Sequence, residues 1–393
     1  MLSKHFGHCR FVFNYFLNER IEQYKKGKKS DNYYVQAKTL TDLKKREDTK
    51  WLKEVNSQTL QFALRSLDIA YVNFFRGNAQ FPKFKSRKHK NTFTVPQFGK
   101  LEDGKIILPK FKDGIKVKLH REVKGEIGKM SITKTPTGKY YVSIFTKQQI
   151  EDLQKTNEQV GIDLGLKDFV ITSDNKKFKN NRYTKKYARK LKKAQQHLSR
   201  KQKGSNGFEK QKLKVAKIHE KIVSCRLDTL HKVSKELVES YDLISVEDLN
   251  VKGMIKNHKL SKHIADASWG NFVTLLQYKC DWYGKELVKV NRFYPSSKTC
   301  GDCGWINQDL KLSDREWACT SCGVVHDRDA NASRNILKEG LKIFGQGLSS
   351  TKAEDKSDYL GSTSVETRSP SHRFSVGGQF TDTSSSFGDK RCE

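Results

Sequence analysis

Apolar residues near the start of the chain recur with the period of an α-helix. The stripe advances by four, three, four and three residues and comprises Leu60, Leu64, Leu67, Tyr71 and Phe74. Asn56 or Ser57 is suited to cap the start of this helix, and Gly77 is suited to end it. A second helix is expected over residues 11–24. The pattern therefore predicts a helical region over residues 1–76.

After residue 77 the apolar period shortens to that of a β-strand. Apolar and polar residues alternate over 115–119, 130–133 and 140–145, and turns that contain glycine separate these runs. Several short strands with tight turns are typical of a closed sheet. We therefore expect a small β-barrel over residues 77–152.

From residue 160 onward, short apolar runs alternate with long helical patterns, which is typical of an α/β domain. One run ends at Asp163 and is followed by a second over residues 169–172, which predicts a hairpin, and another run ends at Glu247. The remaining elements expected are two long helices around a turn at 204–207, a helix over 269–282 and a strand over 286–290. The chain is thus predicted to be a multidomain α+β protein.

The charge balance adds a partner to this picture, because it is strongly one-sided. The 393 residues carry 76 Lys and Arg against 44 Asp and Glu, a net charge of +32. Residues 341–393 hold seven basic and seven acidic residues in a Ser-, Thr- and Gly-rich stretch that predicts a disordered tail. The whole excess therefore lies in residues 1–340, where it favours a polyanionic partner, and nucleic acid is the leading candidate.

Other classes of protein fit the sequence poorly. No run reaches the roughly 18–20 uncharged apolar residues of a membrane span, so we expect no membrane partner. The apolar block of residues 11–17 precedes Asn18, Glu19 and Arg20 rather than a cleavage site for export. Four of the eight cysteines form CxxC pairs and four are scattered, which is typical of metal binding in a reducing compartment. The expected location is cytoplasmic.

Two basic segments are candidates for contact with nucleic acid. Residues 182–221 hold 15 basic and 2 acidic residues, and the candidates there are Lys185, Lys186, Arg189, Lys190, Lys192 and Lys193. In the other segment, cations alternate with aromatic rings that suit base stacking; they are Lys83, Lys85, Arg87 and Lys88, interleaved with Phe81, Phe84 and Phe93. The alternative for both segments is a solvated basic surface.

The cysteine spacing is the most specific signal in the chain. Cys300-x-x-Cys303 and Cys319-x-x-Cys322 are separated by fifteen residues, as in a four-cysteine zinc ribbon. Each CxxC turn aims two thiolates at one ion, and two turns complete a closed tetrahedral site. His326 lies close by in sequence, but four thiolates already fill the shell. We therefore expect these cysteines to hold a structural Zn²⁺.

Acidic residues stand at three telling places in this basic chain. Asp163 and Glu247 end apolar strands, while Asp327 and Asp329 follow the second CxxC pair. Ligands gather at strand ends of an α/β sheet. Three converging carboxylates suit two Mg²⁺ ions about 4 Å apart, which activate water and stabilise the leaving oxygen of a phosphodiester. Each carboxylate taken alone is more often a helix cap or an ion-pair partner.

Four motifs, in chain order, resemble the TnpB family, the transposon-encoded relatives of miniature type V CRISPR effectors and of Fanzor proteins. They occupy residues 160–168, 245–250, 293–322 and 327–331. The resemblance implies an RNA-guided DNA endonuclease that depends on Mg²⁺. Its catalytic, magnesium-binding residues would be Asp163, Glu247 and Asp329, with Asp327 as the alternative third carboxylate. Guide RNA and target DNA would be its partners, because base pairing reads sequence while the protein grips the backbone.

The resemblance also implies an order of domains. They are a helical recognition region (1–76), a wedge-like β-barrel (77–152), a RuvC-like nuclease of RNase H fold with a basic helical insertion (153–292), the zinc ribbon (293–324), the final nuclease motif (325–340) and the tail (341–393). Relatives begin with a wedge strand that precedes the helix at residues 6–15, and this strand is expected to be missing here.

Two other functions are compatible with the sequence. One is a transposase, or a transposase-associated DNA-binding protein, acting in DNA transposition or recombination. The other is a nuclease-inactive RNA-guided DNA-binding repressor. A repressor would be free to lose the three carboxylates, yet all three are present. The guided nuclease is therefore the favoured hypothesis.

Overall fold

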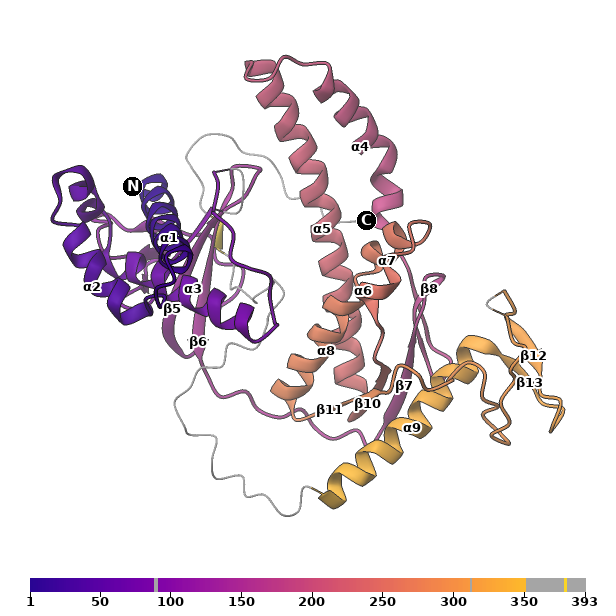
Figure 1. Cartoon of the computed structure of the whole chain (residues 1–393). Coiled ribbons are helices and arrows are strands. Elements are labelled where there is room, and N and C mark those ends of the chain that lie inside the picture. The colour runs from indigo at the N-terminus through magenta and orange to yellow at the C-terminus, as the bar shows by residue number, and fades with distance from the viewer. Residues whose placement is uncertain (88–90, 312, 351–377, 380–393) are drawn as a thin grey trace. The chain divides into compact units, whose positions relative to one another are not determined.

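The computed structural model describes residues 1–87, 91–311, 313–350 and 378–379. Two compact units divide the chain (Figure 1): the first comprises Met1–Gln149 together with strand β14 (Gly378–Gln379), and the second begins at Ile150. None of the described helices combines the length and the apolar character that crossing a membrane requires.

Helices form the first part of the first unit. They are α1 (Leu2–Lys25), α2 (Tyr33–Leu43), the 3₁₀ helix η1 (Glu47–Glu54) and α3 (Ser57–Phe75). The predicted apolar stripe of α3 is confirmed, because its side chains from Leu60 to Tyr71 are buried. The Asn56 side chain accepts a hydrogen bond from the Gln58 N–H and caps the helix. Gly77, with a φ of +69°, follows its end.

The strands of the first unit form two sheets, of order β1-β5-β6-β14 and β2-β3-β4. Their bounds are β1 (Asn91–Val95), β2 (Lys100–Glu102), β3 (Lys105–Ile107), β4 (Ile115–Lys116), β5 (Glu126–Lys134) and β6 (Tyr140–Lys147). The strands predicted over 130–133 and 140–145 are confirmed within β5 and β6. The strand predicted over 115–119 ends at Lys116.

The predicted β-barrel is wrong, because neither of these sheets closes on itself. A barrel buries its apolar face by closure. Here a helix covers that face instead: the rings of His5 and Phe6 from α1 lie 4.9 and 5.1 Å from the ring of Phe93 in β1. The second sheet has strands of only two or three residues, which are too short to continue around a barrel.

A five-stranded sheet of order β11-β10-β7-β8-β9 forms the centre of the second unit. Its strands are β7 (Gln159–Leu164), β8 (Asp168–Thr172), β9 (Lys177–Lys179), β10 (Leu243–Glu247) and β11 (Glu286–Val290). β7, β8 and β9 form an antiparallel meander, which confirms the predicted hairpin, and β10 pairs in parallel with both β7 and β11. The carboxyl ends of β7, β10 and β11 therefore meet at one edge of the sheet.

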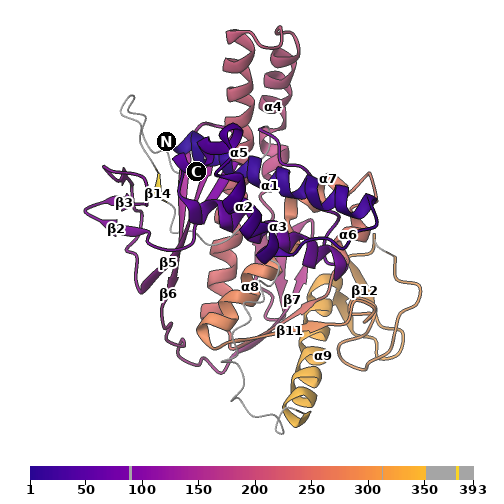
Figure 2. The ribbon, with the colours of Figure 1, turned by 60° about the vertical axis from the view of Figure 1, so that its left-hand side comes forward.

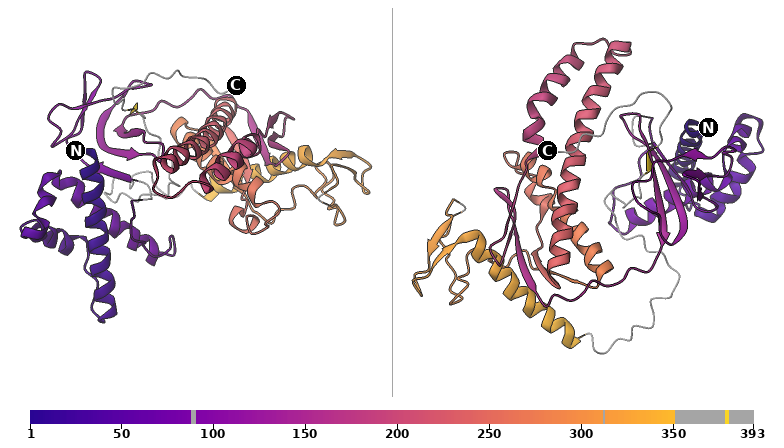
Figure 3. Two further views of the ribbon diagram at one scale, coloured as in Figure 1. Left: turned by 90° about the horizontal axis from the view of Figure 1, so that it is seen from above. Right: turned by 180° about the vertical axis from the view of Figure 1, so that it is seen from behind.

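The described part of the second unit has six helices: α4 (Tyr183–Ser199), α5 (Asn206–Ser240), α6 (Val251–Met254), α7 (Ser261–Ala267), α8 (Trp269–Tyr283) and α9 (Arg328–Ser350). α4 and α5 stand side by side as a long hairpin and pack through Ala194, Ile218 and Ile222 (Figure 1). α5 and α8 pack together on one face of the sheet, and α9 crosses the other face (Figure 3).

Helix α9 approaches the sheet very closely, and two glycines make this possible. A Cβ on Gly161 of β7 would lie 2.1 Å from the backbone oxygen of Ser333, and a Cβ on Gly340 would lie 1.9 Å from the Oγ of Ser245 in β10. No side chain larger than hydrogen fits at either place without displacing backbone or a buried strand residue. These close approaches fix both the height and the rotation of α9 over the sheet.

The predicted boundary of the tail is wrong, because α9 continues to Ser350 rather than ending at residue 340. Leu341, Ile343 and Phe344 are partly buried and extend the apolar face of the helix. The rest of the predicted tail, apart from β14, lies outside the described residues.

A small two-stranded sheet lies between β11 and α9 in the chain. Its strands β12 (Glu316–Ala318) and β13 (Val325–Asp327) pair antiparallel. β13 ends at Asp327 and α9 starts at the next residue, so the chain runs from this sheet directly into the helix (Figure 1). Figure 2 labels β11, β12 and α9 in a second view. We call residues 293–327 the ribbon.

Candidate functional site

The structure places Asp163 and Glu247 side by side at the carboxyl ends of neighbouring strands. The parallel register pairs Gly161 with Ser245 and Ile162 with Val246, so the next pair along is Asp163 and Glu247. Because side chains alternate along a strand, Asp163 shares a face with Gly161, and Glu247 shares a face with Ser245. That is the face on which α9 lies. Both carboxylates therefore face the helix.

Asp329 lies in the first turn of α9, and Asp327 has a different role. The Asp327 carboxylate accepts hydrogen bonds of 3.0 Å from the N–H groups of Asp329 and Ala330, so it caps the helix. It also pairs with Lys177 at 3.4 Å. Partial burial acts to raise the pKa of Asp327, but these hydrogen bonds and the lysine charge outweigh it and hold the pKa below its ordinary value.

Electrostatics connects the three carboxylates that the sequence singled out. Burial is the main cause that raises the pKa of Asp163 to about 7, and the charges of Asp329 and Glu247 raise it further against the opposing charge of Arg328. Burial also raises the pKa of Glu247, together with the charge of Asp248. The site is thus a concentration of negative charge at the edge of the sheet.

The three carboxylates are grouped rather than in contact. Within the described parts of the chain, no three carboxyl groups have oxygen atoms that all lie within 4.8 Å of one another. Asp329 is 25% exposed and pairs with Arg315 of the ribbon at 3.3 Å. The Arg315 guanidinium therefore compensates part of the negative charge that Asp329 brings near Asp163.

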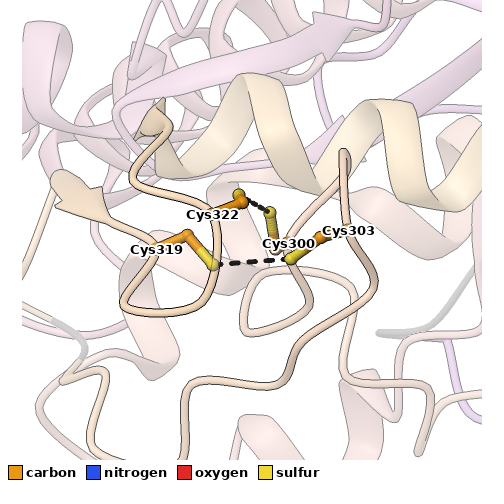
Figure 4. Close-up of side chains that lie close together, drawn as sticks. All are labelled: Cys300, Cys303, Cys319 and Cys322. Atoms are coloured by element: carbon orange, nitrogen blue, oxygen red, sulfur yellow. Dashed lines mark hydrogen bonds between the residues drawn. The ribbon is translucent and has the colours of Figure 1, made fainter.

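The four predicted cysteines do meet, and their sulfur atoms all lie within 4.8 Å of one another (Figure 4). Cys300 and Cys322 are 3.7 Å apart, and Cys303 and Cys319 are 3.6 Å apart. Four sulfur donors at such spacing form a closed shell for one metal ion.

Matching backbone turns build the two halves of this cluster. In one, the Cys300 N–H donates to the Trp305 oxygen at 2.7 Å; in the other, the Cys319 N–H donates to the Val324 oxygen at 2.8 Å. Gly304 and Gly323 follow the second cysteine of each pair with φ of +79° and +76°, where glycine is favoured. The Trp305 N–H and then the neighbouring cysteines lower the pKa of Cys303 to about 7, whereas the same neighbours raise the pKa of Cys322, so Cys303 is the first of the two to become a thiolate.

His326 contacts this cluster, a contact that the sequence did not predict. Its Nε2 lies 3.0 Å from the Cys300 sulfur and 3.7 Å from an oxygen of Asp302. Its ring is buried against Trp317 at 4.9 Å between ring centres. Cys300, Asp302 and His326 form a second, overlapping group of ligand atoms within 4.8 Å. His326 therefore lies next to the four-sulfur shell as a neighbour of one ligand.

All six basic side chains singled out on α4 are exposed: Lys185, Lys186, Arg189, Lys190, Lys192 and Lys193. Ala194 is the buried residue of this helix, and it packs against α5. The cations thus stand on the surface that α5 leaves open.

The basic residues of the first unit differ from one another. Lys83 and Arg87 are exposed. The Lys85 side chain is exposed as a whole, but its ammonium lies 3.7 Å from the centre of the Phe13 ring, where the loss of hydration lowers its pKa. Lys88 lies outside the described residues. Of the interleaved rings, Phe81 and Phe84 are exposed, while Phe93 is in the core, so it cannot stack on a base.

The second unit also has a small pocket that sequence reasoning missed. It encloses about 170 Å³ and is lined by Leu166, Asn180, Arg182, His263 and Asp266. The Asp266 carboxylate accepts hydrogen bonds of 2.6 Å from both Thr184 and Arg226. These residues come from three distant segments, so no spacing in the sequence signals the cavity.

Comparisons with known proteins agree on one family. Three family models match: a probable transposase over residues 142–258, a Cas12f1-like TNB domain over 269–336 and a helix-turn-helix domain over 1–29. A protein of Streptomyces pristinaespiralis, provisionally named an RNA-guided DNA endonuclease, is 37% identical over 93% of this chain and 91% of its own length. The Escherichia coli protein InsQ, with the same provisional name, is 34% identical over 87% of this chain and 89% of its own.

More distant matches extend this result. A TnpB-like protein of Acanthamoeba polyphaga mimivirus is 33% identical over 52% of this chain and 42% of its own length. The fold resembles that of Cas12f1 in a complex with sgRNA and target DNA, with a TM-score of 0.53 and 12% identity over 85% of this chain and 81% of that one. Given the two relatives that match over most of their length, this chain belongs to the TnpB family.

Proposed function

We propose that the protein is an RNA-guided DNA endonuclease that hydrolyses phosphodiester bonds in a metal-dependent reaction. The observation that carries the proposal is the position of Asp163 and Glu247 at neighbouring strand ends, one residue beyond the last paired residues Ile162 and Val246, facing the helix whose Asp329 acts electrostatically on Asp163. The names of the relatives that are 34–37% identical support the same activity.

The nuclease part is assigned a RuvC-like fold of the RNase H type. Its support is the mixed sheet, in which a three-stranded meander is followed by two parallel strands, with helices on both faces. In this proposal Asp163, Glu247 and Asp329 are the catalytic residues. Asp327 is assigned to the helix cap, because its carboxylate already receives two backbone N–H groups.

The same three carboxylates fit Mg²⁺ as a donor set. Magnesium takes hard oxygen ligands, and the pKa of Asp163 is raised first by burial and then by the charges of Asp329 and Glu247, an environment that a cation would stabilise. Asp163, Glu247 and Asp329 would hold two ions. When bound, the ions activate water and stabilise the leaving oxygen. The protein itself holds two of the ligands on rigid strands and the third on a helix that is locked against the sheet.

The partners proposed are a guide RNA and a target DNA. The exposed cations of α4, with Lys83 and Arg87 in the first unit, are placed to contact phosphates. Lys85 is a weaker candidate, because its ammonium lies against Phe13. Phe81 and Phe84 remain available for stacking on bases.

The four-cysteine cluster is assigned to a structural Zn²⁺. Its donor set is four sulfur atoms with no open position, which suits Zn²⁺ in a site that stabilises folding. The proposed location is the cytoplasm, where buried thiols such as those of Cys9 and Cys280 stay reduced. Residues 293–324 of the ribbon are assigned to target binding, residues 1–76 to recognition of the guide, and residues 77–152 to the wedge.

The decisive experiment starts with the protein purified from cells that carry its native flanking DNA. Any bound RNA is sequenced, and a target that matches its guide segment is tested for Mg²⁺-dependent cutting. We expect a discrete RNA, cutting by the unmodified protein, and no cutting by Asp163→Ala with RNA binding unchanged. Asp327→Asn is the matched control: it keeps an oxygen for the helix cap, so it should still cut. Loss of cutting in Asp327→Asn with normal folding would move the third catalytic role to Asp327.

One comparison favours a second candidate function, because the matched family model is described as a probable transposase. A transposase joins DNA ends to a new target without an RNA. No bound RNA, together with strand transfer that depends on Asp163, would support that alternative. A bound RNA and target binding without cutting would instead indicate a repressor.

A further inference from the structure

Helix α9 carries two buried asparagines that face the ribbon. Asn331 and Asn335 are each 2% exposed. The Asn331 amide donates to the Thr299 oxygen at 2.7 Å and accepts from the Gly301 N–H at 2.9 Å. The Asn335 amide donates to the oxygens of Ser296 and Thr299 at 2.8 and 2.6 Å. Three backbone groups, in the first CxxC turn and in the residues just before it, thus have hydrogen-bond partners on this helix.

The same stripe of the helix binds a fourth backbone group of that turn. Lys338 donates to the Gly301 oxygen. Asn331, Asn335 and Lys338 are spaced i, i+4 and i+7, so they lie on one side of α9. A Cβ on Gly301 would lie 2.8 Å from the Asn331 Oδ1, so the turn is seated as closely as its backbone allows.

The opposite stripe of the helix is held by the sheet. Ser333, Leu337 and Gly340 have the same i, i+4 and i+7 spacing and make the close contacts with Gly161 and Ser245. Two residues separate the stripes, which is about 200° around an α-helix. The sheet and the ribbon therefore contact α9 on nearly opposite sides of the helix.

The ribbon also reaches the first turn of α9, where Asp329 lies. The Arg328 N–H donates to the Arg315 oxygen at 2.8 Å, and its guanidinium donates to the Lys311 oxygen at 3.0 Å. Arg315 itself pairs with Asp329 at 3.3 Å. The surroundings of this carboxylate thus depend on the fold of the ribbon.

We propose that Asn331 and Asn335 are positioning residues of the nuclease: they fasten the four-cysteine ribbon to α9, so that a folded ribbon fixes the position of Asp329 relative to Asp163 and Glu247. This inference rests on the proposed role of Asp329. It gives the four-cysteine site an indirect part in catalysis, because loss of its metal would weaken the contacts between the ribbon and α9. The two carboxylates on the strands would stay in place.

The test compares Asn331→Ala with the unmodified full-length protein. Four measurements are made: metal content, binding of the co-purified RNA, Mn²⁺ affinity by electron paramagnetic resonance, and the rate of target cutting across Mg²⁺ concentrations. We expect unchanged zinc content and RNA binding, roughly 10-fold weaker Mn²⁺ affinity, and a cutting rate lowered on the order of 10²-fold. The Mg²⁺ concentration for half-maximal cutting should rise, which a merely structural role would not produce.

Asn32→Ala is the matched control. Like Asn331, Asn32 makes two hydrogen bonds to backbone groups, but both are accepted, from the N–H groups of Tyr34 and Val35, and they cap α2 in the first unit. It should leave Mn²⁺ affinity unchanged. An equal loss in Asn32→Ala would mean general destabilisation and would overturn the inference, as would normal Mn²⁺ affinity and cutting in Asn331→Ala.

Two further variants keep the test informative if Asn331→Ala does not fold. Lys338→Met removes an exposed side chain of the same stripe and should weaken Mn²⁺ binding in the same direction by less. Cys303→Ser removes an exposed ligand of the proposed zinc site. It should weaken Mn²⁺ binding and also lower the zinc content. If the unmodified protein binds Mn²⁺ but never cuts, the proposed function fails while the Mn²⁺ measurements still decide the role of the asparagines.

Discussion

Strand β10 carries a carboxylate at each end, and the two have opposite surroundings. Asp242, just before its amino end, accepts hydrogen bonds from the N–H groups of Thr156 and Asn157 at 3.1 and 2.7 Å and pairs with the buried ammonium of Lys285. Burial acts to raise its pKa, but these donors lower it to about 2. Glu247, at the carboxyl end, has a raised pKa because burial and the charge of Asp248 act together.

The contrast separates a carboxylate that stabilises the fold from one that is held ready for a ligand. A compensated charge lowers the free energy of the folded state, whereas buried like charges raise it. Sites that break the rules of stability are commonly functional. The contrast supports the proposal that the carboxylate at the amino end of β10 serves stability and the carboxylate at its carboxyl end serves catalysis.

Removing the charge of Glu247, at the carboxyl end of β10, should have the largest effect on cutting. Glu247→Gln keeps the shape of the side chain and removes its charge. We expect the cutting rate to fall more than about 100-fold, since removing a metal ligand costs more than removing an outer-shell partner. Stability in urea should stay equal or rise, because one of three repelling charges is gone. Cutting within a few-fold of the unmodified rate would contradict this assignment.

Removing the charge of Asp242, at the amino end of β10, should lower the stability and leave cutting intact. Asp242→Asn leaves Lys285, whose side chain is 1% exposed, without its partner. We expect the free energy of unfolding at pH 7 to fall by about 2–4 kcal/mol, with cutting retained below the unfolding transition. Urea unfolding measures the first quantity and a cleavage assay the second.

The pH dependence of stability offers an independent check on Asp242. Its folded pKa of about 2 lies below the ordinary value of 3.8, so its contribution is present above pH 4 and is lost as the pH falls toward 2. The difference in stability between the unmodified protein and Asp242→Asn should therefore shrink over that interval. A difference that stays constant from pH 5 to pH 2 would show that the charge of Asp242 is not responsible.

A smaller effect is expected from moving α9 away from the functional end. A Cβ on Gly340 meets Ser245, whereas Gly345 on the same helix has nothing within 4 Å. Gly340→Ala should cost about 1–3 kcal/mol by overpacking and slow the cutting. Gly345→Ala should add up to about 1 kcal/mol, because alanine favours helix, and should leave cutting unchanged. Equal effects of the two variants on stability would refute the close approach of α9 to β10.

The smallest effect on the stability of the fold should come from neutralising exposed cations on α4, away from the sheet. Lys185, Arg189 and Lys192 are exposed on α4. Neutralising all three to Gln should change stability by less than about 0.5 kcal/mol each. The slope of log affinity for nucleic acid against log salt should fall by about 0.7–0.9 for each phosphate that the removed cations had neutralised. Lys235→Gln serves as the control, since its charge is already paired with Glu239. An unchanged slope would remove α4 from the interface.

Several features could be predicted because they depend on neighbours in sequence. The two CxxC turns are closed by hydrogen bonds that span five residues, so their spacing alone predicted the four-sulfur cluster. The buried stripe of α3 and the strands that end near Asp163 and Glu247 follow from local periodicity in the same way.

Other features could not be predicted, because they depend on which distant segments pair. The sequence determined the elements, the cysteine cluster and the carboxylates at strand ends. Only the tertiary structure decided that β10 lies beside β7 with Glu247 next to Asp163, and that Asp327 caps α9 while Asp329 acts on Asp163. It also decided that the sheets of the first unit stay open, since α1 covers the face that a barrel would enclose. Local periodicity is a property of short segments, whereas face, register and long-range pairing are set by the packing of segments far apart in the chain.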